Sequence, residues 1–258
     1  MFFWGSILSQ LLVQAELEHG SLEFLGVLYK NRIPVCSGVM YTPRVFLTAA
    51  TCFSTSLDNY YMLPSASMVI PDPKPLRFPR LRDNAGVLQR RVKVHELLFH
   101  HSYRRHGKSA YNIVVGALKS YNHTHTKTYH LAELDEYNVG FLSLWNLTLI
   151  GWSKPWSSTD AIFGLPPASQ AIVGKPTKCS YPRQYFPEAE ICPISPEENP
   201  DLCNYYFGTP LILQGSRPVM VVALKAWAGS CQLPHQTESY IRTYAIFSWV
   251  EDFITNLT

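Results

Sequence analysis

Short apolar runs separated by turn-forming residues dominate the first part of the chain. Residues 25–29, 35–40 and 45–48 form three such runs, each of the length of a strand. Pro43 and Arg44 supply a turn between the last two runs. The pattern therefore predicts a series of short strands that follow one another closely.

The last part of the chain follows a different period. Its apolar residues recur at the spacing of a helix, at Ile246, Phe247, Trp249, Val250, Phe253, Ile254 and Leu257. We therefore predict a C-terminal helix over about 244–256. We interpret its apolar stripe as core packing rather than as a binding face.

The composition agrees with a β-rich protein. The chain has 258 residues, 47% of them hydrophobic and 16% charged, which suits one globular domain or two tightly packed halves. Its 15 Tyr and 19 Pro favour strands and loops over a helical bundle. No interior run reaches about 18 apolar residues, so we predict no membrane span.

The N-terminal segment has features of a signal peptide. Residues 1–15 contain no acid, and residues 13–15 offer small side chains at a cleavage site before Glu16. The usual positive charge is missing, since no Lys or Arg precedes Lys30, and the alternative is an ordinary buried strand or helix. We predict a secreted, extracellular protein, in which six cysteines permit three disulfides with fifteen possible connectivities.

Three Asn-x-Thr triplets, at Asn122, Asn146 and Asn256, are candidate N-glycosylation sites. Asn122 is the best candidate, because the residues around it are polar and typical of a loop. Asn146 lies in a strand-like run, and Asn256 lies at the very end of the chain. On this basis we predict a glycoprotein.

The region 74–108 is rich in basic residues. It contains ten Lys or Arg against two acids, a net charge of +8, whereas the whole chain carries +3. One interpretation is a patch that binds a polyanion or an acidic partner. The other, which we favour, is a set of solvated loops whose charges are scattered in space.

Two groups of histidines raise the question of a metal site: His100, His101 and His106, and then His123, His125 and His130. A His-x-His pair on a strand places both rings on one face, where they could hold a metal ion. These histidines lack a Cys or an acid at ligand spacing, so we interpret them as polar loop residues. We predict no metal ion and no cofactor.

The segment 202–211 reads Leu-Cys-Asn-Tyr-Tyr-Phe-Gly-Thr-Pro-Leu. It resembles the segment that carries the nucleophile in trypsin- and chymotrypsin-like serine proteases, which reads Cys-x-Gly-Asp-Ser-Gly-Gly-Pro-Leu. The residues that match this pattern are Cys203, Gly208, Pro210 and Leu211. The resemblance places the nucleophile position on Phe207, whose hydrocarbon ring has no lone pair to attack a carbonyl.

Two further segments resemble the rest of the catalytic triad. Residues 45–52 read Val-Phe-Leu-Thr-Ala-Ala-Thr-Cys, similar to the family's Leu-Thr-Ala-Ala-His-Cys, and place the general base on Thr51, whose hydroxyl pKa is far from 7. Residues 111–118 are similar to the family's Asn/His-Asp-Ile-Ala-Leu-Leu-x-Leu. They place the triad Asp on Asn112, which carries no charge to stabilise an imidazolium.

Later segments extend the resemblance and select one cysteine pairing. Residues 149–152, Leu-Ile-Gly-Trp, resemble the family's Val-x-Gly-Trp-Gly turn. The pairing implied by the resemblance uses all six cysteines, as Cys36–Cys52, Cys179–Cys192 and Cys203–Cys231.

The resemblance also identifies the positions of the specificity pocket. Asp201 falls where trypsin-like members keep a pocket Asp, Ala228 where the family has a Gly after the conserved Trp, and Glu238 on or near a pocket-wall Gly. A side chain at such a Gly position fills the space that the Gly leaves open. We therefore predict an occluded pocket formed by Asp201, Tyr205, Tyr206, Trp227, Ala228 and Glu238.

The features needed for zymogen activation are missing as well. The family is activated by cleavage before an Ile/Val-Val-Gly-Gly terminus, whose freed amine pairs with the Asp beside the nucleophile. No such motif occurs in the chain, and Tyr206 stands at the Asp position. We therefore expect no conversion from a zymogen to an enzyme.

The resemblance covers about 22–255 and implies an all-β, chymotrypsin-like fold. This fold consists of two packed antiparallel β-barrels of six strands each, followed by the C-terminal helix. The first barrel is expected over about 21–135 and the second over about 136–243.

Since all three triad positions are replaced, the resemblance implies a secreted, catalytically inactive serine protease homologue of the kind that is numerous in insects. It would act by protein binding, as a cofactor, decoy or scaffold for active serine proteases or another extracellular partner. The alternatives are a polyanion-binding module, a hydrolase with a relocated nucleophile and a diverged relic without a partner. We expect no nucleic-acid partner and leave the oligomeric state open.

Overall fold

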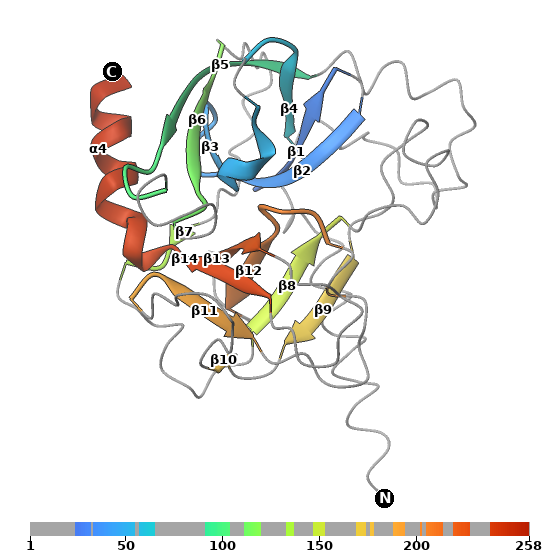
Figure 1. Ribbon diagram of the computed structural model, residues 1–258, viewed down its shortest axis with the longest axis vertical. Coiled ribbons are helices and arrows are strands. Elements are labelled where there is room, and N and C mark those ends of the chain that lie inside the picture. Colours follow the sequence, from blue (N-terminus) through green and yellow to red (C-terminus); the bar gives the residue numbers. More distant parts are fainter. Residues whose placement is uncertain are drawn as a thin grey trace, which may run out of the picture.

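The computed structural model shows two β-rich halves that lie one above the other (Figure 1). The C-terminal helix lies beside the upper half, which contains the first strands of the chain. The structure describes residues 24–31, 33–54, 57–64, 91–103, 111–119, 133–136, 147–152, 169–173, 176–177, 188–193, 202, 205–213, 219–227 and 238–257.

The first half is a closed barrel. Its strands are β1 (Leu25–Lys30), β2 (Ile33–Met40), β3 (Val45–Thr48), β4 (Tyr60–Pro64), β5 (Val92–Phe99) and β6 (Val114–Leu118). They pair antiparallel in the order β1-β2-β3-β6-β5-β4, and the pairing of β1 with β4 closes the ring. The first predicted barrel is thus confirmed, with three of its strands at the positions of the three apolar runs.

Short connections set the register of the first strands. Asn31, with a φ of 58°, lies in the turn between β1 and β2, and Asn is one of the few non-glycine residues that tolerate this conformation. The turn before β3 is held by the Thr42 hydroxyl, which accepts hydrogen bonds from the backbone N–H groups of Arg44 (3.2 Å) and Val45 (3.0 Å). The resulting register pairs Val39 with Leu47.

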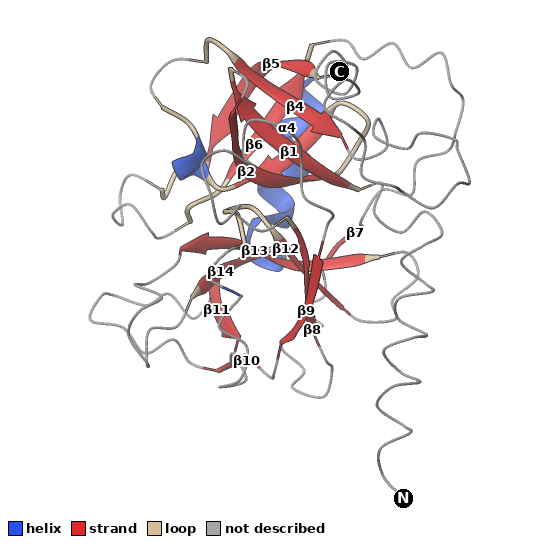
Figure 2. Ribbon diagram, turned by 90° about the vertical axis from the view of Figure 1, so that its right-hand side faces the viewer, coloured by secondary structure: helices blue, strands red, loops and turns tan. Residues whose placement is uncertain are grey.

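The second half is a sheet. Its strands are β7 (Glu133–Leu134), β8 (Leu147–Gly151), β9 (Ser169–Val173), β10 (Pro176–Thr177), β11 (Glu190–Pro193), β12 (Pro210–Leu213), β13 (Met220–Trp227) and β14 (Ser239–Arg242). The order is β10-β11-β14-β13-β12-β8-β9, with β7 parallel to β13. Among the described residues no strand pairing closes this sheet, so the expected second barrel is seen here as an eight-stranded sheet (Figure 2).

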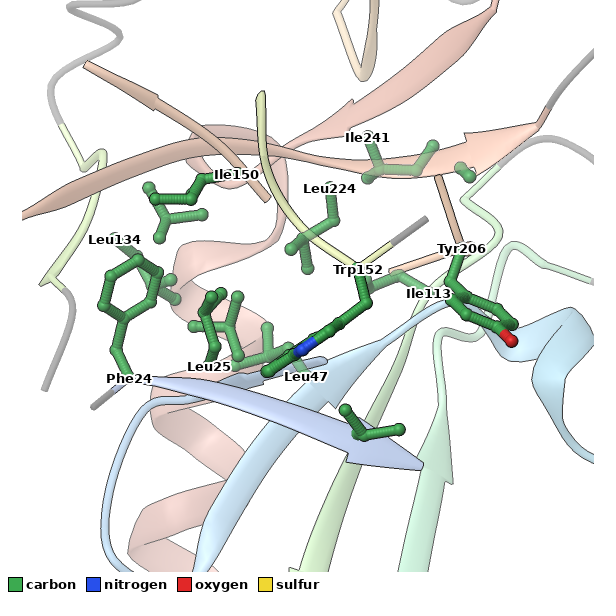
Figure 3. Packing of buried hydrophobic residues seen from close by; sticks show 14 of the residues in the cluster. Phe24, Leu25, Leu47, Ile113, Leu134, Ile150, Trp152, Tyr206, Leu224 and Ile241 are labelled. Atoms are coloured by element: carbon green, nitrogen blue, oxygen red, sulfur yellow. The ribbon is translucent and has the colours of Figure 1, made fainter. Parts of the chain in front are cut away.

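A central core joins the two halves. Its residues come from both halves and are buried (Figure 3). The first half contributes Phe24, Leu25, Leu47 and Ile113, and the second contributes Ile150, Trp152, Leu224 and Ile241. Because apolar burial stabilises by roughly 25 cal/mol per Å², a shared core of this kind fixes one half against the other. The candidate site described below lies on segments that this core holds in place.

The C-terminal helix α4 (Phe247–Leu257) follows a short 3-10 turn, η5 (Tyr244–Ile246). It leaves the second sheet after β14 and packs on the first barrel, where Phe253 contacts a cluster with Val45 and Val115. Its Val250 is buried in the central core. The apolar stripe is therefore core packing, as predicted, and no helix in the described part of the chain is long and apolar enough to cross a membrane.

Candidate functional site

Thr51, at the predicted general-base position, lies in a 3-10 turn, η1 (Ala50–Cys52), that directly follows β3. The turn is tied to β2 by the Cys36–Cys52 disulfide, which confirms the first predicted pairing. Thr51 is exposed, whereas its neighbours Ala50 and Cys52 are buried. The disulfide and the buried neighbours thus hold Thr51 at the surface between the two halves.

Asn112, at the predicted triad Asp position, is 1% exposed and faces Thr51. Its Oδ1 accepts a hydrogen bond from the Thr51 backbone N–H at 2.9 Å, and its Nδ2 donates to the Thr51 hydroxyl at 3.2 Å. The same Nδ2 donates to the backbone carbonyl of Ala226 in β13, and so joins the halves. An ionised Asp accepts hydrogen bonds only and could not donate to the Ala226 carbonyl.

Phe207, at the predicted nucleophile position, is half-buried against a cluster that contains Cys36 and Cys52. Its carbonyl accepts a hydrogen bond from the Ser37 backbone N–H at 2.8 Å. The next residue, Gly208, has a φ of 79°, and its N–H donates to the Lys225 carbonyl at 2.7 Å. The Cys36–Cys52 disulfide therefore links the turn of Thr51 to β2, and the Ser37 N–H links β2 to Phe207.

Tyr205 and Tyr206, which we predicted to occlude one pocket together, pack in two different cores. Tyr205 packs in the core of the second sheet with Leu202, and Tyr206 packs in the central core beside Trp152 (Figure 3). Successive residues of an extended segment point to opposite sides, which separates the rings. Burial raises the pKa of Tyr206, so the phenol stays neutral where the family keeps an Asp.

Glu238, at the predicted pocket wall, is 7% exposed and paired with a residue that sequence reasoning missed. The Lys225 Nζ lies 2.6 Å from the Glu238 Oε1 and donates to the Leu202 carbonyl, also at 2.6 Å. The Tyr240 hydroxyl donates to the Glu238 Oε2 at 2.8 Å. A lysine inside the apolar strand 220–227 was the signal that could have revealed this network.

Several predicted positions fall outside the described residues. They are the signal peptide 1–15, the sequons at Asn122 and Asn146, the pocket residues Asp201 and Ala228, and the cysteines Cys179, Cys203 and Cys231. Cys192 is disulfide-bonded, but its predicted partner Cys179 is among these positions. The side chain of Trp227 is not described, and Asn256 is exposed on α4, where its Nδ2 donates to the Asp252 carbonyl at 2.7 Å.

Of the ten basic residues in the region 74–108, the structure describes Arg91 and Lys93. Arg91 lies over the rings of Tyr29 and Tyr61, at 5.4 Å and 5.0 Å from their centroids, and donates to the Asn31 carbonyl. Its guanidinium is thus held against the barrel. Both interpretations of this region, the favoured solvated loops and the polyanion-binding patch, stay predictions.

Among the histidines considered as metal ligands, His100 and His101 are described, and His106, His123, His125 and His130 are not. The described part of the chain contains no group of three side chains that could hold a metal ion. The His100 ring is instead stacked between His101 and Tyr111, each at 4.3 Å, and meets Trp249 edge-on at 5.0 Å. This stack supports Tyr111, which directly precedes Asn112.

We expect the fold to lose stability as the pH falls from neutral towards 4. Burial, with a smaller effect of His101, lowers the pKa of His100 from 6.5 to about 4. The stabilising contribution of the neutral ring is therefore complete above pH 6.5 and is lost as the pH falls towards 4. One unit of pKa difference corresponds to about 1.4 kcal/mol, and only part of the full difference is lost before the pH falls below the folded-state pKa. The loss by about pH 4.5 is therefore on the order of 2 kcal/mol.

Urea unfolding at about pH 7 and at about pH 4.5 measures this loss of stability. The matched variant His100→Phe keeps an aromatic ring but cannot take up a proton. Its free energy of unfolding should fall less between the two pH values than that of the unchanged chain. An equal fall in both proteins would show that His100 does not carry the pH dependence.

Comparisons with known proteins agree with this geometry. A family model described as Trypsin matches residues 13–250. The solved structure of neuropsin, a serine protease expressed in the limbic system of mouse brain, is similar at a TM-score of 0.61 and 17% sequence identity. The similarity covers 91% of this chain and 96% of that chain. No curated protein matches the sequence.

These similarities and the observed strand order confirm the predicted fold class. A closed barrel, a second sheet and a single C-terminal helix form the chymotrypsin-like arrangement. The family match spans far more than half of the sequence and includes the segments of Thr51, Asn112 and Phe207. The chain belongs to the trypsin family of serine protease domains.

Proposed function

We propose that this chain is a secreted, non-catalytic serine protease homologue that acts by binding an extracellular protein. The observation that carries the proposal is the residue set at the triad positions. Thr51 and Asn112 are hydrogen-bonded to each other, and Phe207 lies on the segment fixed beside them. The scaffold of a catalytic site is assembled, but its side chains differ from those that the chemistry requires.

Each replacement removes a different part of acyl transfer. Phe207 has no atom that could attack a carbonyl. Thr51 cannot store a proton near neutral pH and return it to a leaving group. Asn112 has its amide engaged by Thr51 and Ala226, and it brings no negative charge. Loss of triad groups leaves at most the part of the rate, about 10³–10⁴ over water, that an oxyanion hole and binding supply.

The surroundings of Tyr206 support the same proposal. In the family, the residue at this position pairs with the amine freed by activation. Tyr206 is buried in the central core and its pKa is raised, so the side chain at this position is a neutral phenol. A side chain of this kind contributes to the core and gives no partner for a freed amine.

The proposed role is that of a cofactor, decoy or scaffold for an active serine protease, as in the inactive homologues that insects secrete. Retention of the fold without its reacting groups favours such a role, because the loops of this scaffold remain available for recognition. The Cys36–Cys52 disulfide supports an extracellular location, since disulfides persist in oxidising compartments.

Affinity capture tests the binding part of the proposal. The tagged, secreted chain is recovered from the extracellular fluid of its source, and bound proteins are identified by mass spectrometry. We expect an active serine protease to co-purify, and we expect its rate on a peptide substrate to change when the pure chain is added. If no protease is captured and added chain leaves protease rates in the fluid unchanged, the cofactor, decoy and scaffold roles are wrong.

A further inference from the structure

A fully buried lysine lies beside the candidate site. Lys225 is 0% exposed and sits in β13, where it pairs with Tyr240 of β14. On its other side, its N–H donates to the Thr209 carbonyl at 2.9 Å, and its carbonyl accepts from Gly208 at 2.7 Å. The backbone of Lys225 therefore borders the nucleophile segment directly.

The Lys225 ammonium is held by groups from two other segments. It donates to the Leu202 carbonyl and to the Glu238 Oε1, each at 2.6 Å. The second oxygen of Glu238 accepts from the Tyr240 hydroxyl at 2.8 Å, so both carboxylate oxygens are bonded. A buried ion pair with this degree of hydrogen bonding avoids the cost of an uncompensated charge.

The partners of Lys225 place its ammonium beside predicted positions of the specificity pocket. Leu202 directly follows Asp201, the predicted pocket acid, and Glu238 occupies the predicted pocket wall. The ammonium therefore bridges Leu202 and Glu238, one beside and one at a predicted pocket position. It also neutralises the charge of Glu238, which would otherwise attract a basic ligand.

We propose that Lys225 is a built-in occupant of the specificity pocket, with its ammonium in the place of an incoming basic side chain. The pocket consequently admits no side chain from a partner. The inference rests on the proposed non-catalytic function for its biological meaning. It implies that the protein partner is bound by the surface of the domain and not by insertion of a Lys or Arg side chain.

A cationic aromatic ligand can test whether the pocket is closed. The probe is p-aminobenzamidine, whose fluorescence rises when it leaves water, and it is titrated into the full disulfide-bonded chain. We expect no saturable binding by the unchanged protein. The double variant K225V/E238G, which shortens both side chains, should bind at least about tenfold more tightly.

A matched variant distinguishes the effect of side-chain volume on probe binding from the effect of charge. K225M/E238Q removes both charges but keeps nearly the same volume, so it should remain closed to the probe. Saturable binding by the unchanged protein would overturn the proposal. The same holds if K225V/E238G, shown by circular dichroism to be folded, binds no better than the unchanged chain.

A second measurement does not depend on any variant folding. The native chain is treated with an amine-acetylating reagent, and labelled lysines are quantified by mass spectrometry. We expect Lys225 to react far more slowly than the exposed Lys93 and Lys119. Labelling of Lys225 at the rate of those residues would show an accessible pocket and contradict the proposal, whether or not the chain proves to be catalytic.

Discussion

Replacing Lys225 alone with Met is expected to lower the free energy of unfolding by about 3–5 kcal/mol, because it leaves a buried carboxylate without its cation. Glu238 is 7% exposed, so water cannot substitute for the lost ammonium. In the same variant the Leu202 carbonyl keeps only the Tyr205 backbone N–H as a donor. Urea unfolding near neutral pH measures the loss, and the midpoint should shift without a large change in slope.

The double variant K225M/E238Q is the control for this prediction. It removes both charges and keeps the volumes, and replacement of both members of a buried ion pair is often close to neutral. We therefore expect the double variant to be more stable than K225M, so that the double-mutant cycle gives a large coupling. If K225M costs no more than about 1 kcal/mol, which is ordinary for surface ion pairs, Lys225 and Glu238 do not form a buried pair.

Replacing Gly208 with Ala is expected to destabilise the fold by about 3 kcal/mol or more, since strain and steric overlap act together. The φ of 79° at Gly208 lies in the region that favours glycine. A Cβ at this position would also overlap the Ser37 carbonyl oxygen and the Thr48 hydroxyl. The Ser37 carbonyl belongs to the backbone of β2 and cannot rotate away.

Gly151→Ala provides the matched control for Gly208→Ala. A Cβ at Gly151 would meet the side chain of Thr209 at 2.9 Å, and Gly151 has no positive φ. A side chain can shift where a backbone carbonyl cannot, so the control should lose clearly less stability in the same unfolding measurement. Equal losses would mean that the backbone conformation at Gly208 contributes little to the fold.

The location of Thr51 could be predicted because it follows from local motifs. Thr-Ala-Ala-Thr-Cys places Thr51 after a buried strand, and Cys36 provides the disulfide that fixes it. The helical period of the last residues likewise predicted α4. These features depend on residues that are close in sequence, or on a family motif in which the paired cysteine is known.

The Lys225–Glu238 pair could not be placed in this way. Lys225 lies on β13 and Glu238 directly precedes β14, so their contact depends on the register of β13 against β14. A lysine in an apolar strand signals a buried cation, but sequence alone does not identify which acid it meets. The stack of His100 on Tyr111 and Trp249 depends similarly on how α4 docks on the first barrel.

The opposite directions of the Tyr205 and Tyr206 side chains could have been predicted from the sequence. The relevant signal is that side chains alternate between the two sides of an extended segment. Residues 205 and 206 enter different cores because consecutive side chains of an extended segment diverge. In our proposal Lys225 and Glu238 occlude the pocket, whereas the two tyrosines pack in the cores. Composition alone, with its many tyrosines, could not separate these roles.

Labelling with a fluorophosphonate probe tests whether the chain is non-catalytic, because the probe forms a covalent bond only with an activated hydroxyl. The purified, secreted chain is compared with active trypsin and with its own heat-denatured form. We predict labelling of trypsin and none of this chain above the denatured control. Stoichiometric labelling of the chain that heat abolishes would reveal a working nucleophile and contradict the account.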